Sequence, residues 1–145
     1  MTKIRPLTKA DVKTVAGLEK ASFSAPWTQE SLLSTLSRAD FIGYVLETDG
    51  GEIVGYVFGS ILFEDAELHR IAVKSESRGK GYGGRVLDGF LQGVKARGGE
   101  RVFLEVRVSN APARKLYDSR GFDLFRTRRY YYDDGEDALE MKKEL

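Results

Sequence analysis

The stretch Arg78-Gly-Lys-Gly-Tyr-Gly-Gly-Arg85 decides the fold, because it stands between an apolar segment that ends at Val73 and a helical segment, residues 82–96. Apolar residues of the helical segment recur on one face, at positions 86, 87, 90, 91 and 94. Glycines before a helix expose backbone N–H groups, and the helix dipole adds partial positive charge there. The stretch therefore predicts a phosphate or pyrophosphate site between a strand and a helix.

The segments around this loop predict a mixed α/β fold. We expect strands at residues 4–7, 41–47, 52–63, 67–73, 101–108, 122–132 and 138–143, and helices at residues 8–22, 28–36, 82–96 and 111–120. The order βααβββαβαββ indicates a mixed sheet with helices on its faces, in one domain that spans residues 1–145. In the segment 101–108, Val102, Leu104 and Val106 take one face, which leaves Glu105 on the other.

Composition excludes several classes of chemistry. The chain has no cysteine and one histidine, His69, which rules out thiol nucleophiles, disulfides, cysteine-ligated zinc and a histidine-rich metal site. The 23 basic and 22 acidic residues nearly cancel, so no overall charge attracts nucleic acid or a membrane surface. No stretch approaches the roughly 20 apolar residues that span a bilayer. We expect a cytoplasmic protein with no metal, no membrane partner and no direct nucleic-acid partner.

Two other interpretations of the glycine loop are weaker. Gly79, Gly81 and Gly84 spell GxGxxG, and Glu105 follows about 20 residues later, as in dinucleotide-binding proteins. However, the first glycine lies several residues beyond Val73, Glu105 lies inside a predicted strand, and too little chain remains for the second half of such a sheet. A solvated turn would explain one or two glycines but hardly four in six positions.

Several motifs together resemble one family. Arg78-x-x-Gly81-x-Gly83, preceded by Leu68-His-Arg-Ile-Ala-Val73, resembles the acetyl-CoA signature of the GNAT superfamily of N-acetyltransferases. Further segments are similar to the RimI-type branch, which acetylates the N-terminal alanine of a small-subunit ribosomal protein: Phe23-Ser-Ala-Pro-Trp27, Leu104-Glu-Val-Arg107, Ser109-Asn110, Leu116-Tyr117 with Gly121-Phe122, and Arg128-Arg-Tyr-Tyr-Tyr132 with Glu136-Asp-Ala138. Arg78-Gly-Lys80 departs from the Gln or Arg-Arg-Gln that this branch often has there, and is closer to archaeal relatives.

The resemblance implies acetyl-CoA as cofactor and a protein N-terminal α-amine as acceptor. It implies that the backbone of Ile71, Ala72 and Val73 holds the pantetheine, and that Asn110 contacts the cofactor. The pyrophosphate would be held by Arg78, Gly79, Lys80, Gly81, Tyr82, Gly83, Gly84 and Arg85. Two alternatives remain open: an enzyme of the same class that acetylates a small amine or a lysine side chain, and a domain that binds acyl-CoA without turnover.

Glu105 is the candidate general base. A free α-amine has a pKa near 8 and is mostly ammonium at pH 7, so attack on a thioester requires loss of a proton, directly or through water. We expect Glu105 in a central strand, where an unpaired carboxylate is costly and a low dielectric favours a proton acceptor near neutrality. An ion pair with Arg107, two residues along the same face, is the structural alternative.

Tyr117 is the candidate general acid. A departing coenzyme A thiolate leaves more readily if it is protonated, and a phenol with an ordinary pKa near 10 keeps its proton at neutral pH. Tyr117 belongs to the helical segment that follows the Glu105 strand, and the Leu-Tyr-x-x-x-Gly-Phe match to the family supports the role. The alternative is a packed core aromatic.

Aromatic residues predict the walls of an acceptor site. Tyr130, Tyr131 and Tyr132 are expected on one side. Phe23, Pro26 and Trp27 are expected on the other, unless they only pack the two short helices. The same tyrosines stand among Arg126, Arg128 and Arg129, a pattern that RNA-binding strands share, but alternation in a strand sends the arginines to solvent. His69 is left out of the site, because a lone histidine is usually a packed side chain.

Overall fold

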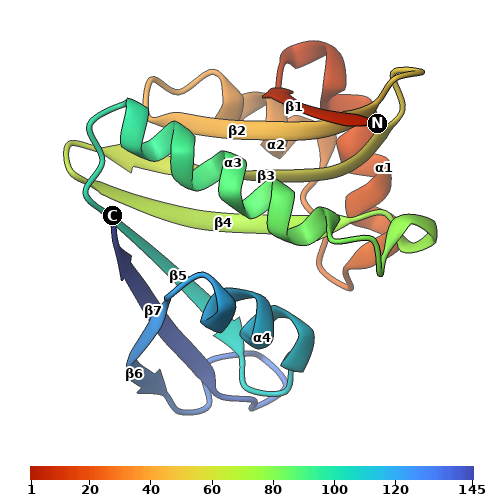
Figure 1. Cartoon of the computed structure of the whole chain (residues 1–145). Helices are drawn as coiled ribbons and strands as arrows, with labels where there is room; N and C mark the ends of the chain where they lie inside the picture. The colour runs from red at the N-terminus through yellow and green to blue at the C-terminus, as the bar shows by residue number, and fades with distance from the viewer.

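A seven-stranded sheet forms the centre of the computed structural model, which describes residues 1–145 (Figure 1). The strands are β1 (Thr2–Pro6), β2 (Phe41–Thr48), β3 (Ile53–Leu62), β4 (Asp65–Val73), β5 (Arg101–Arg107), β6 (Asp123–Arg128) and β7 (Ala138–Glu144). Their order across the sheet is β1-β2-β3-β4-β5-β7-β6, and every neighbouring pair is antiparallel except β4 with β5. The predicted mixed α/β fold and its element order are confirmed.

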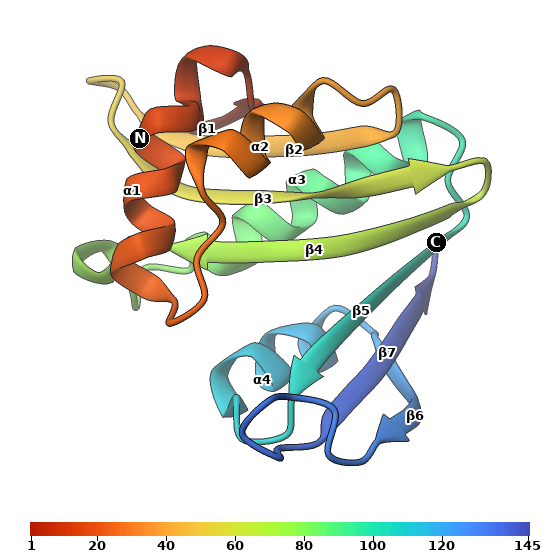
Figure 2. The same cartoon turned by 180° about the vertical axis from the view of Figure 1, so that it is seen from behind.

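Helices cover both faces of the sheet. One face carries α3 (Tyr82–Ala96) and α4 (Ala111–Ser119), while α1 (Val12–Ser22) and α2 (Gln29–Leu36) lie on the other, seen from behind in Figure 2. Short 3-10 helices, η1 (Lys9–Asp11) and η2 (Ser75–Ser77), precede α1 and α3. None of the helices is long and apolar enough to cross a membrane.

The apolar stripe of α3 supports the sheet as its spacing predicted. Val86, Leu87, Phe90 and Val94 are completely buried against β2, β3 and β4. Full burial of such a side chain contributes roughly 1.5–3 kcal/mol. This packing fixes the start of α3, and with it the glycine loop, close to the end of β4.

The strands β4 and β5 pair at one end only. Their register runs from Asp65 opposite Arg101 to Glu67 opposite Phe103 and stops there, after which the two strands diverge (Figures 1 and 2). A β-bulge lies at the same place, because the pairing with β3 shifts so that His69 is an extra residue in β4. Gly59 permits this bulge, since a Cβ there would collide with the carbonyl of Glu67.

The predicted strand 122–132 was wrong at its end. The strand β6 stops at Arg128, and Tyr130 adopts a left-handed backbone with φ of 54°, which cannot continue a strand. The Tyr130 N–H donates instead to Oδ1 of Asp137, at 2.9 Å. The residues after Arg128 therefore form a turn that folds back toward β5.

A buried carboxylate holds the chain between β1 and α1. Oδ2 and Oδ1 of Asp11 accept hydrogen bonds from the Arg5 guanidinium at 2.8 and 2.9 Å, and Oδ2 also accepts from the Thr8 N–H at 2.8 Å. The Asp11 side chain is only 7% exposed. Its hydrogen bonds with Arg5 hold the pKa of Asp11 below its usual range, against the opposing effect of burial.

We expect Asp11→Asn to lower the free energy of unfolding by about 2 kcal/mol at pH 7, because hydrogen bonds to a charged group are lost. The folded-state pKa of Asp11 is depressed, so this contribution is present above the ordinary aspartate pKa near 4 and disappears as the pH falls below it. Urea unfolding of both proteins from pH 7 to pH 2 measures the difference. A difference independent of pH would contradict the assignment of the stability to this ion pair.

Candidate active site

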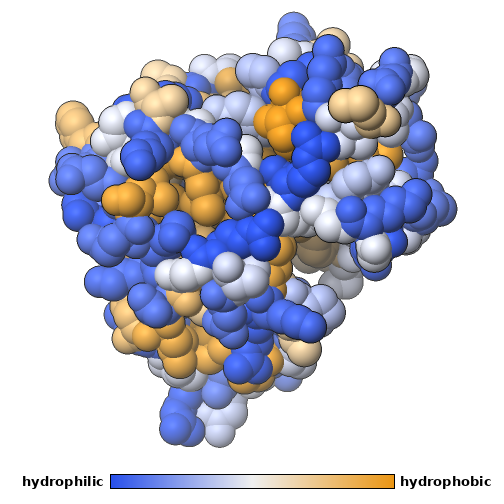
Figure 3. Space-filling model, in the orientation of Figure 1, coloured by the Kyte–Doolittle hydropathy of each residue, from blue (hydrophilic) through white to orange (hydrophobic).

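The glycine loop presents a row of free backbone donors. Gly79 and Gly81 have φ of 80° and 78°, a left-handed backbone that glycine adopts without strain. No backbone carbonyl accepts from the N–H groups of residues 79–84, since the first bond of α3 joins the Arg85 N–H to the Gly81 carbonyl at 3.3 Å. The surface is hollowed between the start of α3 and α4 (Figure 3). These donors, at the positive end of a 15-residue helix, fit a pyrophosphate.

The end of β4 offers a second row of backbone groups. Ile71, Ala72 and Val73 pair with β3 on one edge, and their other edge faces β5 beyond the point where the two strands separate. An extended ligand with amide groups can pair with such an edge as a further strand would. The predicted pantetheine and pyrophosphate segments are therefore continuous in space.

Three polar side chains predicted for the cofactor site bind protein groups instead. Arg78 Nε donates to the Val73 carbonyl at 3.2 Å, and the Arg85 guanidinium donates to the hydroxyl and carbonyl of Thr2. The Asn110 Oδ1 caps α4 by accepting from the Ala113 N–H at 3.2 Å. Lys80 is exposed, whereas Tyr82 is half-buried against the core. Cofactor contacts by these five side chains stay predictions.

A groove opens on the α1 and α2 face of the sheet. It has a volume of about 410 Å³ and lies where β4 and β5 diverge. Its lining residues are Trp27, Glu67, Leu68, His69, Arg70, Glu105, Tyr131 and Tyr132. We call it the acceptor groove. It brings together Glu105, Trp27 and Tyr131, three residues that the sequence analysis selected from distant segments.

Glu105 differs from its expected environment. Its side chain is 32% exposed rather than buried, because β4 has separated from β5 at this position. The expected alternative, an ion pair with Arg107, is wrong: Arg107 binds Asp134 and Glu136, at 2.8 and 3.0 Å. The nearest cation to Glu105 is Arg128, at 3.9 Å. Glu105 thus lines the groove without a close ion pair.

The Glu105 carboxylate raises the pKa of two tyrosines of the turn. Hydrogen bonding to Glu105, followed by its negative charge, raises the pKa of Tyr131. Burial raises the pKa of Tyr132, and the charge of Glu105 adds to the effect. Tyr132, which belongs to the predicted tyrosine wall, also lines the groove. Tyr130, in contrast, is 79% exposed and does not line the groove.

Tyr117 lies on the opposite face of the sheet from Glu105. It is 4% exposed, packs against Phe122 at a ring distance of 5.6 Å, and belongs to the same core as Leu104 and Val106 of β5. Burial is the main cause that raises the pKa of Tyr117 above its ordinary value. The hydroxyl therefore keeps its proton throughout the neutral and moderately alkaline range.

The remaining walls of the groove come from the loop before α2 and from β4. The Trp27 ring stacks on the His69 ring, with centroids 6.3 Å apart and planes 13° apart. Phe23 does not line the groove, and its ring packs against the guanidinium of Arg70, 3.9 Å from the ring centroid. His69 and Arg70 were not predicted as lining residues. The β-bulge that turns them toward the groove cannot be recognised from the order of residues along β4 alone.

The basic residues of β6 are paired rather than free. Arg126 donates to both carboxylate oxygens of Glu140 at 3.1 and 2.9 Å, and Arg128 Nε lies 3.0 Å from the same carboxylate. The Arg128 guanidinium also lies over the Tyr131 ring, at 5.0 Å. Of the two, Arg128 therefore contacts the tyrosine wall, and Arg126 does not.

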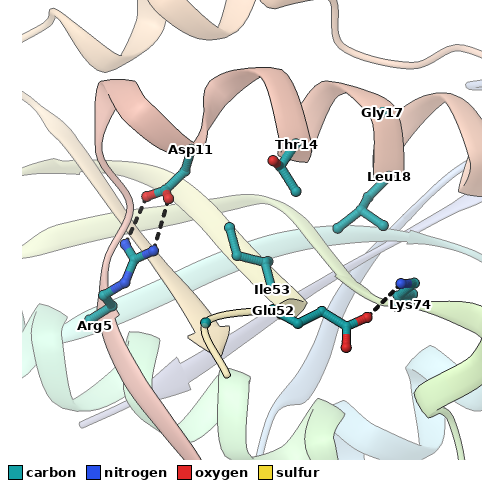
Figure 4. Close-up of a pocket in the computed structure, with 9 residues that line it drawn as sticks. Arg5, Asp11, Thr14, Gly17, Leu18, Glu52, Ile53 and Lys74 are labelled. Carbon is teal, nitrogen blue, oxygen red and sulfur yellow. Dashed lines mark hydrogen bonds and ion pairs between the residues drawn. The ribbon is translucent and has the colours of Figure 1, made fainter. Parts of the chain in front are cut away.

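A second cavity of about 510 Å³ lies between α1 and the start of β3, away from the split in the sheet (Figure 4). Its charged groups are already paired, Arg5 with Asp11 and Lys74 with Glu52. None of the residues predicted for the cofactor or the acceptor lines it. Glu105, Trp27 and Tyr131 lie instead at the split between β4 and β5.

Comparisons with known proteins agree with this geometry. Residues 12–122 match the acetyltransferase (GNAT) family. A Bacillus subtilis protein, provisionally named a ribosomal protein bS18-alanine N-acetyltransferase, is 35% identical over 139 residues, 95% of this chain and 92% of its own. The Escherichia coli ribosomal protein bS18-alanine N-acetyltransferase is 30% identical over 144 residues, 97% of this chain and 96% of its own. A crystal structure of the ribosomal-protein-S18-alanine N-acetyltransferase from Escherichia coli aligns with a TM-score of 0.91 at 29% identity, covering 100% of this chain and 94% of the other.

We expect Gly81→Val to weaken acetyl-CoA binding about tenfold, because a left-handed backbone costs a residue with a Cβ roughly 1–2 kcal/mol and the loop would distort to avoid it. Gly98→Val is the matched control: Gly98 also has a positive φ, 87°, and open space around it, but it follows the far end of α3. Titration calorimetry with acetyl-CoA and with NAD compares the proteins. Equal loss of affinity in both variants, or tight binding of NAD alone, would refute the role of the loop.

Proposed function

Because this chain belongs to the acetyltransferase (GNAT) family, we propose that it transfers an acetyl group from acetyl-coenzyme A to the α-amine of a protein N-terminus. The match over residues 12–122 confirms the family, and with it the cofactor that the family resemblance implied. Relatives named for the alanine of ribosomal protein bS18 favour an N-terminal alanine on a ribosomal protein as the acceptor. Such an acceptor and a chain without cysteine both favour the cytoplasm.

The split sheet carries the proposal. A carboxylate and a phenol lie on opposite faces of β5: Glu105 is on the groove face, and Tyr117 of α4 is on the other. Transfer between two bound molecules needs a proton acceptor beside the nucleophile and a proton donor beside the leaving group. In this arrangement Glu105 would accept a proton from the amine and Tyr117 would donate one to the thiolate, so neither group has to serve both molecules.

The cofactor fits the face that carries α3 and α4. The free N–H groups of residues 79–84 would hold its pyrophosphate, and the open edge at Ile71 to Val73 would hold the pantetheine amides. When bound, acetyl-coenzyme A supplies an acetyl group activated as a thioester. We also assign Arg78, Lys80, Arg85 and Asn110 to this site, although Arg78, Arg85 and Asn110 each already hold a protein group.

Glu105 is assigned as the base. An N-terminal ammonium that enters the acceptor groove must lose one proton before its nitrogen can attack, and the partly exposed carboxylate can take that proton directly or through a water molecule. Arg128 is the nearest cation to this carboxylate, at 3.9 Å. Trp27 and Tyr131 form the walls that orient the first residues of the acceptor.

Tyr117 is assigned as the acid. Its buried hydroxyl donates the proton that the departing thiolate needs, and water can restore that proton after product release. Burial raises the pKa of Tyr117, so the donor is still protonated at the pH, near 8, at which the acceptor amine becomes free.

We expect the protein to acetylate a peptide that begins with alanine and not the same peptide with a blocked N-terminus and an internal lysine. Intact mass after incubation with acetyl-CoA shows the addition of one acetyl group to the first peptide. Acetylation of the blocked peptide would instead favour a lysine side chain as the acceptor.

We expect Glu105→Gln and Tyr117→Phe each to lower kcat by about 100-fold to 10,000-fold while acetyl-CoA still binds, because each removes one proton transfer with little change of shape. The wild-type rate should rise with pH as the base and the acceptor amine lose their protons. Because burial raises the Tyr117 pKa, the rate should not fall before about pH 10, the ordinary phenol value. Stopped assays from pH 6 to pH 10 record the profile. A decline near pH 8 or 9 would show that another group is the acid.

A further inference from the structure

Glu19 is a carboxylate buried in the interface between α1 and the sheet. It is completely inaccessible to solvent, and a buried carboxylate is costly unless hydrogen bonds and a counter-charge satisfy it. Three donors do so: the Tyr56 hydroxyl at 2.5 Å from Oε2, and the Arg70 Nε and the Trp27 N–H, each at 3.0 Å from Oε1. The acceptor groove and this carboxylate are therefore joined directly, since Arg70 and Trp27 both line the groove.

The loop between α1 and α2 depends on these contacts. No backbone–backbone hydrogen bond involves residues 24–27. The loop is held instead by the Trp27 N–H on Glu19, by Arg70 Nη2 on the Ala25 carbonyl at 2.8 Å, and by the Phe23 ring against the Arg70 guanidinium at 3.9 Å. Glu19 therefore holds the loop in two ways: it accepts the Trp27 N–H directly, and it binds Arg70, which in turn contacts the loop.

These contacts determine the position of Trp27, which forms one wall of the groove. With its backbone fixed, Trp27 stacks on His69 and meets Phe58 edge-on at a ring distance of 5.1 Å. A loop without these contacts would have to be ordered again each time an acceptor binds, and ordering even one residue weakens affinity by about tenfold. The cofactor side contains none of these residues, so its affinity does not depend on them.

We propose that Glu19 is a positioning residue for the acceptor, which holds Trp27 as a preformed wall of the groove through the Trp27 N–H and through Arg70. The role rests on the proposed function for the identity of the acceptor, but the hold on Trp27 can be measured without any acceptor. This role would explain why a carboxylate that takes part in neither proton transfer is buried at this position.

Three variants test the role. Glu19→Met removes every acceptor atom while keeping an unbranched side chain, Glu19→Gln restores an oxygen that can accept from both Trp27 and Arg70, and Tyr56→Phe removes only the bond to the other carboxylate oxygen. Glu19→Met should raise KM for the alanine peptide about tenfold, with kcat within about threefold and acetyl-CoA affinity unchanged. Glu19→Gln should recover most of this loss, and Tyr56→Phe should cost stability in urea without changing KM.

Fluorescence supplies the measurement that needs no acceptor. Trp27 is the only tryptophan of the chain, so acrylamide quenching reports on this wall alone. Quenching should increase in Glu19→Met and stay at the wild-type level in Tyr56→Phe. If wild type acetylates no N-terminal peptide, the proposed function fails, while quenching still decides whether Glu19 holds Trp27.

Two results would overturn the role of Glu19: an unchanged KM and quenching in folded Glu19→Met, or a KM in Tyr56→Phe that rises in proportion to lost stability. If Glu19→Met does not fold, Arg70→Lys replaces it. Lysine keeps the counter-charge but loses the bond to Ala25 and the stacking on Phe23, so the same increase in quenching and in KM is expected, and its absence would count against the proposal.

Discussion

The divergence of β4 from β5 is the constraint on which the rest of the structure depends. Parallel neighbours that pair only over residues 65–67 and 101–103 leave the inner edges of both strands without sheet partners. Unpaired peptide groups are costly when buried, so the split persists because each strand is fully paired on its outer side, β4 with β3 and β5 with β7. A ligand that carries amides satisfies these edges, which makes the incomplete part of the sheet its binding site.

Ion pairs link the two halves of the sheet, which also share one hydrophobic core. Arg101 donates to Asp65 at 2.8 Å where the strands still pair. Arg120, at the end of α4, reaches α3 and donates to Asp88 at 3.0 and 3.2 Å. Gly84 makes room for this second contact, because a Cβ there would collide with the Arg120 guanidinium. At least one glycine of the loop therefore serves packing between helices and not the conformation of the loop itself.

Local patterns predicted the elements, and long-range pairing decided the details of the site. The spacing in α3 and the alternation of Val102, Leu104 and Val106 were reliable because each reflects one buried face. The exposure of Glu105 could not be predicted, since a central strand is expected to have neighbours along its whole length. The partnership of Glu19 with Arg70 joins residues far apart in sequence, and no local signal marks it.

The two faces of the split are built from different segments. The acceptor groove takes its walls from the loop before α2 and from the turn after β6, whereas the free backbone donors lie in β4 and at the start of α3. Substitutions in well-separated segments have nearly independent effects. Acceptor choice can therefore diverge during evolution by the exchange of two surface loops, while the segments that would hold the acetyl donor remain under separate selection.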